Sequence, residues 1–132
     1  MAEKLLLALA ALMFATIGLS AAEIPSLVGN WTGSYEGYTN SGSHIGTNEA
    51  VAITLVISEQ IGRLFTGNLS ELGQVTAAVS GVIALDNKTF YMTESDKGYD
   101  IGTVLSNDTI ELLYLEDGEK GGAFIDEFHR VA

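Results

Sequence analysis

Leu27-Val28-Gly29-Asn30-Trp31-Thr32-Gly33-Ser34-Tyr35-Glu36-Gly37-Tyr38 contains the only tryptophan of the chain, two of its five tyrosines and three glycines at every fourth position. The stretch is strand-like because aromatic residues alternate with small and polar ones. A single Trp two residues after a Gly, at the start of such a run, predicts an anchor that opens a β-barrel. We expect the remainder of the chain to close back onto this stretch.

Short runs of Val, Ile, Leu, Phe, Tyr and Thr follow at intervals of about 9 to 12 residues, and each is followed by a cluster of turn residues. Short links between successive strands predict antiparallel neighbours. We therefore predict an all-β fold, a single eight-stranded antiparallel up-and-down barrel with strands over 27–38, 49–58, 63–70, 74–84, 88–94, 99–105, 109–116 and 122–131. The alternative for 75–79 is a helical turn.

Residues 1–22 have the pattern of a secretory signal peptide. Lys4 provides a charged start, Leu5–Leu19 is an apolar run, and Ser20-Ala21-Ala22 offers small residues for cleavage. The run is short for a membrane span, which needs about 20 apolar residues. We predict a signal peptide over 1–22 and a single barrel domain over 23–132, with an uncleaved anchor as the alternative.

The chain is acidic and contains no cysteine. Its formal net charge is −11, from 17 acidic and 6 basic residues. Nucleic acids and anionic membranes prefer basic patches, so we expect neither as a partner and no membrane insertion of the mature domain. An exported domain without cysteine must be held together by packing alone.

Four N-x-S/T triplets predict surface glycans, because chance would produce about one in a chain of this composition. Their acceptors are Asn30, Asn68, Asn87 and Asn107. The alternative is that β-proteins place Asn in turns and Thr in strands. Glycan acceptors without disulfides favour a secreted or cell-surface protein of a prokaryote, and an archaeal surface in particular.

If Asn30, Asn68 and Asn87 face outward, alternation along each strand predicts the interior. The large residues expected inside would fill an eight-stranded barrel, whereas the small ones would leave room for a ligand. The large set is Trp31, Tyr35, Phe65, Leu69, Phe90, Met92, Tyr99, Ile101, Leu105, Ile110, Leu112, Tyr114, Phe124 and Phe128, and the small set is Gly33, Gly37, Ala77 and Gly81. Leu113 and Leu115 fall outside, where outer strands of two copies could form a homo-oligomer. The polar connection Thr39–Asn48 is expected to be a mobile lid or spacer.

Three stretches resemble a known group of barrels. Gly29-Asn30-Trp31 is similar to the G-x-W that opens the first strand of calycins, which include lipocalins, fatty-acid-binding proteins and avidins. Gly62–Gly67 and Asp126–Val131 resemble the Thr-Gly strand and the closing Asp-x-Phe-x-Lys/Arg-Val of avidin and streptavidin. The resemblance implies that Arg130 stacks on Trp31 as a structural anchor and seals one end of the barrel.

The biotin site of that family mostly does not carry over. The family's Asn two residues after the Trp falls on Gly33, and its Ser six residues after the Trp falls on Gly37. The Tyr and Ser of its Thr-Gly-x-Tyr-x-Ser segment fall on Leu69 and Glu71, and only Asp126 has a counterpart. A buried urea needs several fixed polar partners, so we do not expect biotin.

Asp126 is the strongest candidate for a functional residue, because a carboxylate on the inward side must be solvated, paired or neutralised. Four other residues with inward parity complete a candidate polar patch for a small ligand: Tyr35, Glu94, Tyr99 and Tyr114. The alternative is a bulge or register slip that turns Asp126 towards solvent.

Catalytic and metal-binding patterns are weak. His44 and His129 are far apart in sequence, and neither accompanies a Ser nucleophile or a carboxylate at metal-ligand spacing. The acidic segments 94–100 and 116–119 do not match a calcium loop, and no Gly-rich phosphate loop occurs. We therefore expect no enzyme, no cofactor and no metal site.

Two functions are compatible with these residues. The first is an exported module that binds a small ligand in the barrel mouth under Thr39–Asn48. The second is a structural or cell-surface interaction domain with a filled barrel, no ligand, and surface glycans.

Deleting residues 1–22 should leave a folded domain, because no predicted strand uses them. The measurement is circular dichroism and size-exclusion chromatography of the shortened chain in detergent-free buffer. A shortened chain that is insoluble, while the full chain folds only in detergent, would instead identify the segment as an anchor.

Overall fold

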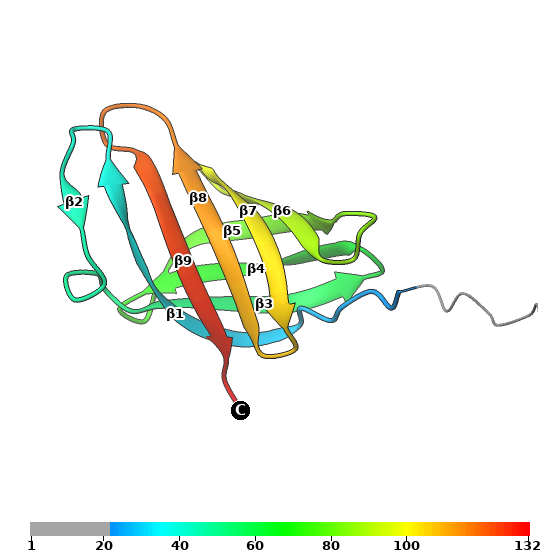
Figure 1. Cartoon of the computed structure of the whole chain (residues 1–132). Coiled ribbons are helices and arrows are strands. Elements are labelled where there is room, and N and C mark those ends of the chain that lie inside the picture. Colours follow the sequence, from blue (N-terminus) through cyan, green and yellow to red (C-terminus); the bar gives the residue numbers. More distant parts are fainter. Residues whose placement is uncertain (1–21) are drawn as a thin grey trace, which may run out of the picture.

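The computed structural model describes residues 22–132, and the predicted signal peptide lies outside this range except for Ala22. The described chain forms one antiparallel sheet in which β1 pairs with both β3 and β9, so that the sheet closes into a barrel (Figure 1). The strands are β1 (Gly29–Thr39), β2 (His44–Ile45), β3 (Ile53–Ile61), β4 (Leu64–Glu71), β5 (Gln74–Ile83), β6 (Thr89–Glu94), β7 (Tyr99–Ser106), β8 (Thr109–Glu116) and β9 (Gly122–Arg130). The predicted eight-stranded antiparallel barrel is confirmed, with β2 as an additional strand. Within residues 22–132, no helix is long and apolar enough to cross a membrane.

Two local expectations differ from the structure. The second barrel strand begins at Ile53 rather than at residue 49, because the amides of Glu49 and Ala50 both donate to the carbonyl of Gly46 in a turn. Residues 75–79 lie in β5, so the helical-turn alternative is wrong. In addition, the connection after β1 contains the short strand β2, which pairs with the end of β1.

The two ends of the barrel differ. At one end lie residues 22–28, the C-terminus and the turns that join β3 to β4, β5 to β6 and β7 to β8. At the other end, the mouth, lie β2 and the loops that join β4 to β5, β6 to β7 and β8 to β9 (Figure 1). Asn40 ties two of the mouth loops together, because its Nδ2 donates to the carbonyl of Gly118 at 2.6 Å.

Trp31 and Arg130 seal the closed end. Trp31 is 1% exposed, and its indole Nε1 donates to the carbonyl of Leu27 at 2.9 Å. The Arg130 guanidinium carbon lies 4.1 Å from the centroid of the Trp31 ring, which is the stacking implied by the calycin resemblance. The same guanidinium donates to the carbonyls of Ser26, Val28 and Asn107 at 2.8, 2.6 and 2.9 Å.

A β-bulge in β3 helps to hold the N-terminal segment across this end. The register shifts between Ile57 and Glu59, which places Gln60 opposite Phe65. The Gln60 side chain accepts from the Leu27 amide at 2.8 Å and donates to the Pro25 carbonyl at 2.9 Å. Leu27 is thereby buried beside Trp31 as part of the core.

The core fills the barrel from the closed end towards the mouth, and glycines make room for its aromatic rings. A Cβ on Gly81 would lie 2.1 Å from the Phe65 ring, and a Cβ on Gly102 would lie 2.1 Å from the Phe90 ring. The two rings meet edge to face with centroids 5.8 Å apart. The expectation that inward Gly81 leaves room for a ligand is therefore wrong, because a neighbouring ring occupies that space.

The expected inward set on β7 is also wrong. Tyr99 is 52% exposed, Leu105 is exposed and Ile101 is on the same outer side, whereas Asp100 and Gly102 face inward. A two-residue turn between β6 and β7 would place Met92 opposite Tyr99. The Glu94 amide instead donates to the Gly98 carbonyl at 3.1 Å and closes a turn of three residues, 95–97, with Asp96 at a φ of 58°. Met92 therefore lies opposite Asp100.

Replacing Arg130 with Lys should lower the free energy of unfolding by about 1.5–3 kcal/mol. The ammonium group of lysine cannot donate to the same three carbonyls in the planar arrangement of the guanidinium. Urea unfolding followed by fluorescence of the single Trp31 measures the change. Arg63→Lys is the matched control, because within residues 22–132 the Arg63 side chain donates a single bond, of 3.2 Å to the Ile83 carbonyl. Equal effects of the two substitutions would contradict the sealing role.

Candidate functional site

A cavity of about 250 Å³ opens at the mouth of the barrel, above the packed core. β2 and the loops at this end surround its entrance. The lining comes from most of the barrel strands and from β2: Tyr35, Thr39, Ile45, Ile53, Leu69, Glu71, Glu94, Lys97, Tyr114, Glu116, Lys120, Phe124 and Asp126. An eight-stranded barrel offers interior space for one small ligand, and this volume fits that limit.

Three aromatic rings from neighbouring strands form one wall of the cavity. Tyr35 on β1 meets Phe124 on β9 edge to face, with ring centroids 5.7 Å apart. Phe124 also contacts Tyr114 on β8, with centroids 6.2 Å apart. The rings belong together because Gly37 and Tyr114 lie directly opposite Phe124 in the sheet. The absence of a side chain on Gly37 admits the Phe124 ring.

Three buried carboxyl groups lie on strands of the same end of the barrel, and two of them are directly opposite tyrosines of the aromatic wall, Asp100 opposite Tyr114 and Asp126 opposite Tyr35. Asp100 on β7 is 0% exposed, and Glu94 on β6 and Asp126 on β9 are each 7% exposed. The pairing of Asp126 with Tyr35 on β1 places its carboxyl at the foot of the aromatic wall. The alternative in which Asp126 turns towards solvent is therefore wrong.

The pKa values of all three carboxyl groups are raised, in each case mainly by burial. Burial, followed by the charges of Glu94 and Asp126, raises the pKa of Asp100 to about 9. Burial, followed by the charge of Glu94, raises the pKa of Asp126 to about 7. Burial also raises the pKa of Glu94, although the nearby Lys97 opposes the shift. At neutral pH, Asp100 is thus protonated and Asp126 is close to half ionised.

Hydrogen bonding within the cluster is incomplete. Glu94 lies near both aspartates, since its charge raises the pKa of each. Both carboxyl oxygens of Asp100 and Oδ1 of Asp126 are fully buried and have no hydrogen-bond partner among the described residues. A buried acceptor without a partner is costly, and Asp126 lines the cavity whereas Asp100 does not, so the Asp126 carboxyl is the group that a bound ligand would satisfy.

The rim of the cavity carries charges of both signs. Glu71 and Glu116 are the acidic groups, and Lys97 and Lys120 are the basic ones. The Tyr114 hydroxyl donates to Glu116 at 2.8 Å, and burial together with this bond raises the pKa of Tyr114. The buried carboxyls of Glu94 and Asp126 also line the cavity, so acidic groups outnumber basic ones around it.

The histidines lie away from this cavity. His44 on β2 stacks against Tyr38 with ring centroids 4.9 Å apart. His129 on β9 is on the outer face, with its Nε2 2.9 Å from Glu127. Within residues 22–132, no group of three or more His, Cys, Asp or Glu residues is arranged to hold a metal ion.

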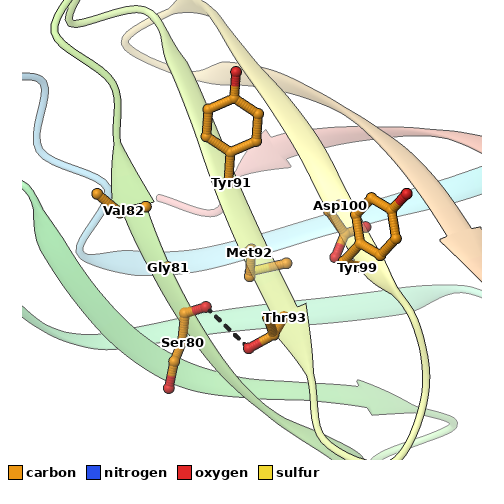
Figure 2. A pocket seen from close by; sticks show the side chains of 8 residues that line it. All are labelled: Ser80, Gly81, Val82, Tyr91, Met92, Thr93, Tyr99 and Asp100. Carbon is orange, nitrogen blue, oxygen red and sulfur yellow. Dashed lines mark hydrogen bonds between the residues drawn. The ribbon is translucent and has the colours of Figure 1, made fainter.

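The structure brings together four of the five predicted site residues: Tyr35, Glu94, Tyr114 and Asp126. Tyr99 is not among them. It lies on the outer face of β7, beside a shallow groove over β5 and β6 that Figure 2 shows. The side chains that point out into this groove, which include Val82 and Tyr91, are uncharged, so the groove offers little to fix a polar ligand.

Sequence reasoning missed Asp100. The same three-residue turn that moves Tyr99 outward moves Asp100 inward. The signal that could have revealed it is Gly102, two residues later on the same face, where the Phe90 ring requires a residue without a Cβ.

The glycan acceptors are distributed over the barrel. Asn30, Asn68 and Asn107 are exposed. Asn87 is half-buried, adopts a φ of 53°, and donates its Nδ2 to the Ala22 carbonyl at 2.7 Å. A glycan on Asn87 would therefore compete with this bond, which leaves three freely accessible acceptors.

No family model and no curated protein sequence matches the chain. A redesigned β-barrel is similar in structure, with a TM-score of 0.56 and 11% identity over 80% of this chain and 92% of that one. A de novo designed fluorescence-activating β-barrel has a TM-score of 0.51 and 18% identity over 79% and 93%. An S-type phycobiliprotein lyase from Guillardia theta has a TM-score of 0.40 and 11% identity over 80% of this chain and 89% of that one, and we draw no conclusion from so low a score. The first two support the barrel fold alone and do not confirm the avidin family.

The carboxyl cluster should make the protein less stable as the pH rises. The raised pKa values mean that the folded state holds protons that the unfolded state has released. The resulting stability is present at about pH 4 and is lost as the pH passes about 7 for Asp126 and about 9 for Asp100. Each titrating group contributes a slope of up to about 1.4 kcal/mol per pH unit.

Asp100→Asn should therefore flatten the loss of stability above pH 7, since the amide cannot ionise. Urea unfolding between pH 5 and 9 measures this, and Asp117→Asn in the exposed β8–β9 loop is the control. An unchanged pH dependence in Asp100→Asn would show that Asp100 does not titrate in this range.

Proposed function

We propose that this protein is an exported binding module that holds one small molecule in the mouth of its barrel. The observation that carries the proposal is the contrast between the two ends. Trp31, Leu27 and Arg130 seal one end, whereas the other end keeps a cavity of about 250 Å³ above the core. Such a concave site, with aromatic walls and a few polar groups, is the usual form of a small-molecule site.

The polar groups of the cavity support the same proposal. A domain that needed only stability would gain nothing from three buried carboxyl groups, because removing a charge from water without a partner is unfavourable. Strained or unsatisfied groups of this kind collect at functional sites. The fold is compatible with such a role, since one solved barrel of similar shape is described as fluorescence-activating.

The wider setting of the proposal comes from the sequence. The pattern of residues 1–22 and the accessible acceptors Asn30, Asn68 and Asn107 support export to a prokaryotic, and in particular archaeal, cell surface. We propose a binding role without catalysis, because the two histidines lie away from the cavity. A relationship to avidins rests on three stretches of sequence and stays a prediction.

The second candidate is a structural or surface-interaction domain without a ligand. It is favoured by the tight packing of the lower barrel and by the exposed apolar side chains of the outer face, such as Val82, Tyr91 and Leu113. On this alternative, copies of the chain would assemble through those strands and the mouth cavity would stay empty.

Titration with prodan, a small neutral dye that brightens in apolar surroundings, separates the two candidates. We expect saturable binding near one dye per chain. Ile45→Trp should weaken it at least about tenfold, because Ile45 is half-buried at the cavity entrance and a larger ring there would obstruct it.

Leu85→Trp is the matched control, since Leu85 is exposed in the turn at the closed end. It should leave dye binding unchanged. Absence of saturable binding, or equal binding by both variants, would contradict the proposed function and favour the structural role.

A further inference from the structure

We infer that the ligand of the mouth cavity is a small organic cation, whose substituted ammonium group lies against Asp126 and is enclosed by Tyr35, Tyr114 and Phe124. This inference rests on the proposed function and specifies its ligand class. It arises from four features of the cavity that point to the same chemistry.

The first feature is the unpaired carboxyl group. Asp126 lines the cavity, is 7% exposed, and has an oxygen, Oδ1, with no hydrogen-bond partner in the part of the chain that the structure describes. Glu94 lies close enough for its negative charge to raise the pKa of Asp126. Among residues 22–132, no Lys or Arg nitrogen lies within ion-pairing distance of the carboxyl groups of Glu94, Asp100 or Asp126. The one Lys or Arg ion pair in this range joins Arg130 to Asp108 at the closed end. The cluster therefore lacks the ion-paired cation that buried carboxylates normally acquire, although the charge of the nearby Lys97 opposes the pKa rise of Glu94.

The second feature is the aromatic wall directly above this group. The linked rings of Tyr35, Phe124 and Tyr114 have their centroids 5.7 and 6.2 Å apart. The faces of aromatic rings attract cations, and several rings around one centre are a known means of binding substituted ammonium groups. A neutral apolar ligand would use the rings but would leave Asp126 unpaired.

The third feature argues against an inorganic cation. No set of three His, Cys, Asp or Glu residues in the described part of the chain has the arrangement of a metal site. A hard divalent cation requires six or more oxygen ligands, whereas the space next to Asp126 is bounded by carbon-rich rings. An organic cation needs only one or two carboxyl contacts and benefits from the rings.

The fourth feature is the charge of the whole chain. A formal net charge of −11 on 132 residues attracts cations and repels anions over long distances. The rim carries two acidic residues, Glu71 and Glu116, and two basic residues, Lys97 and Lys120. Their formal charges cancel, so the basic residues do not reverse the negative charge of the interior.

Binding of a cation should be linked to the release of a proton. A cation prefers the ionised form of Asp126, so its affinity should rise with pH and level off above about pH 7. The titratable groups that surround Asp126 on the packed elements are Tyr35, Glu71, Glu94, Lys97, Asp100, Tyr114, Glu116 and Lys120. Choline is a suitable probe because its quaternary ammonium group does not titrate.

The test compares choline with 3,3-dimethyl-1-butanol, which has the same shape without the charge, by isothermal titration calorimetry of the full protein. At pH 8 we expect choline to bind at least about tenfold more tightly than the alcohol. Its affinity should fall several-fold at pH 5.5, whereas that of the alcohol should not change. Asp126→Asn, which keeps the shape of the side chain, should reduce the preference for choline to less than about twofold.

Asp117→Asn is the matched control, because it removes one negative charge from an exposed loop at the same end of the barrel. It should retain the preference for choline. Glu94→Gln provides a second variant if Asp126→Asn fails to fold, and it should also reduce the preference.

Equal affinity for choline and the alcohol would overturn the inference, as would an unchanged preference in Asp126→Asn. Displacement of prodan by calcium chloride, but not by choline at the same ionic strength, would overturn it as well. Binding of prodan without any binding of choline would overturn the cation assignment and leave the proposed function intact. Absence of all binding would remove both.

Discussion

Closure of β1 against β9 is the constraint on which the rest of the structure depends. The pair runs from Trp31 opposite Arg130 to Thr39 opposite Gly122, so both ends of the barrel are built on it. At one end, Arg130 stacks on Trp31 and collects three carbonyls from separate segments. At the other, Asp126 and Phe124 of β9 stand opposite Tyr35 and Gly37 of β1 and form part of the cavity. Disrupting this pairing would therefore affect the seal and the site together.

The barrel divides its interior between stability and binding. Trp31, Phe65 and Phe90 fill the lower part, where glycines on neighbouring strands accept the rings. That packing provides the hydrophobic stabilisation on which a domain without cysteine depends. It compensates for the cost of keeping Glu94, Asp100 and Asp126 buried near the mouth, where the sheet's hydrogen bonds hold their strands in place. The carboxyl groups can then stay in an unfavourable state until a ligand satisfies them.

Much of this arrangement could be predicted from the sequence. Alternation along a strand is a local property, so the inward positions of Trp31, Phe65, Leu112 and Asp126 follow from the chain itself. The same pattern predicts which four site residues share the interior. Register between strands is different, because the number of residues in a turn sets it. Because of the three-residue turn before β7, Asp100 rather than Tyr99 faces the interior. The bulge in β3 places Gln60 at the closed end.

The sequence by itself determined the all-β class, the opening anchor and the acidic character of the chain, because each depends on residue type and local periodicity. Only the tertiary structure decided that Asp100 joins Asp126 and Glu94, and that rings fill the space beside Gly81 and Gly102. It also decided that the cavity remains at one end alone. These features depend on which side chains from distant strands meet inside the closed barrel, and that is set by register and closure, which no single segment encodes.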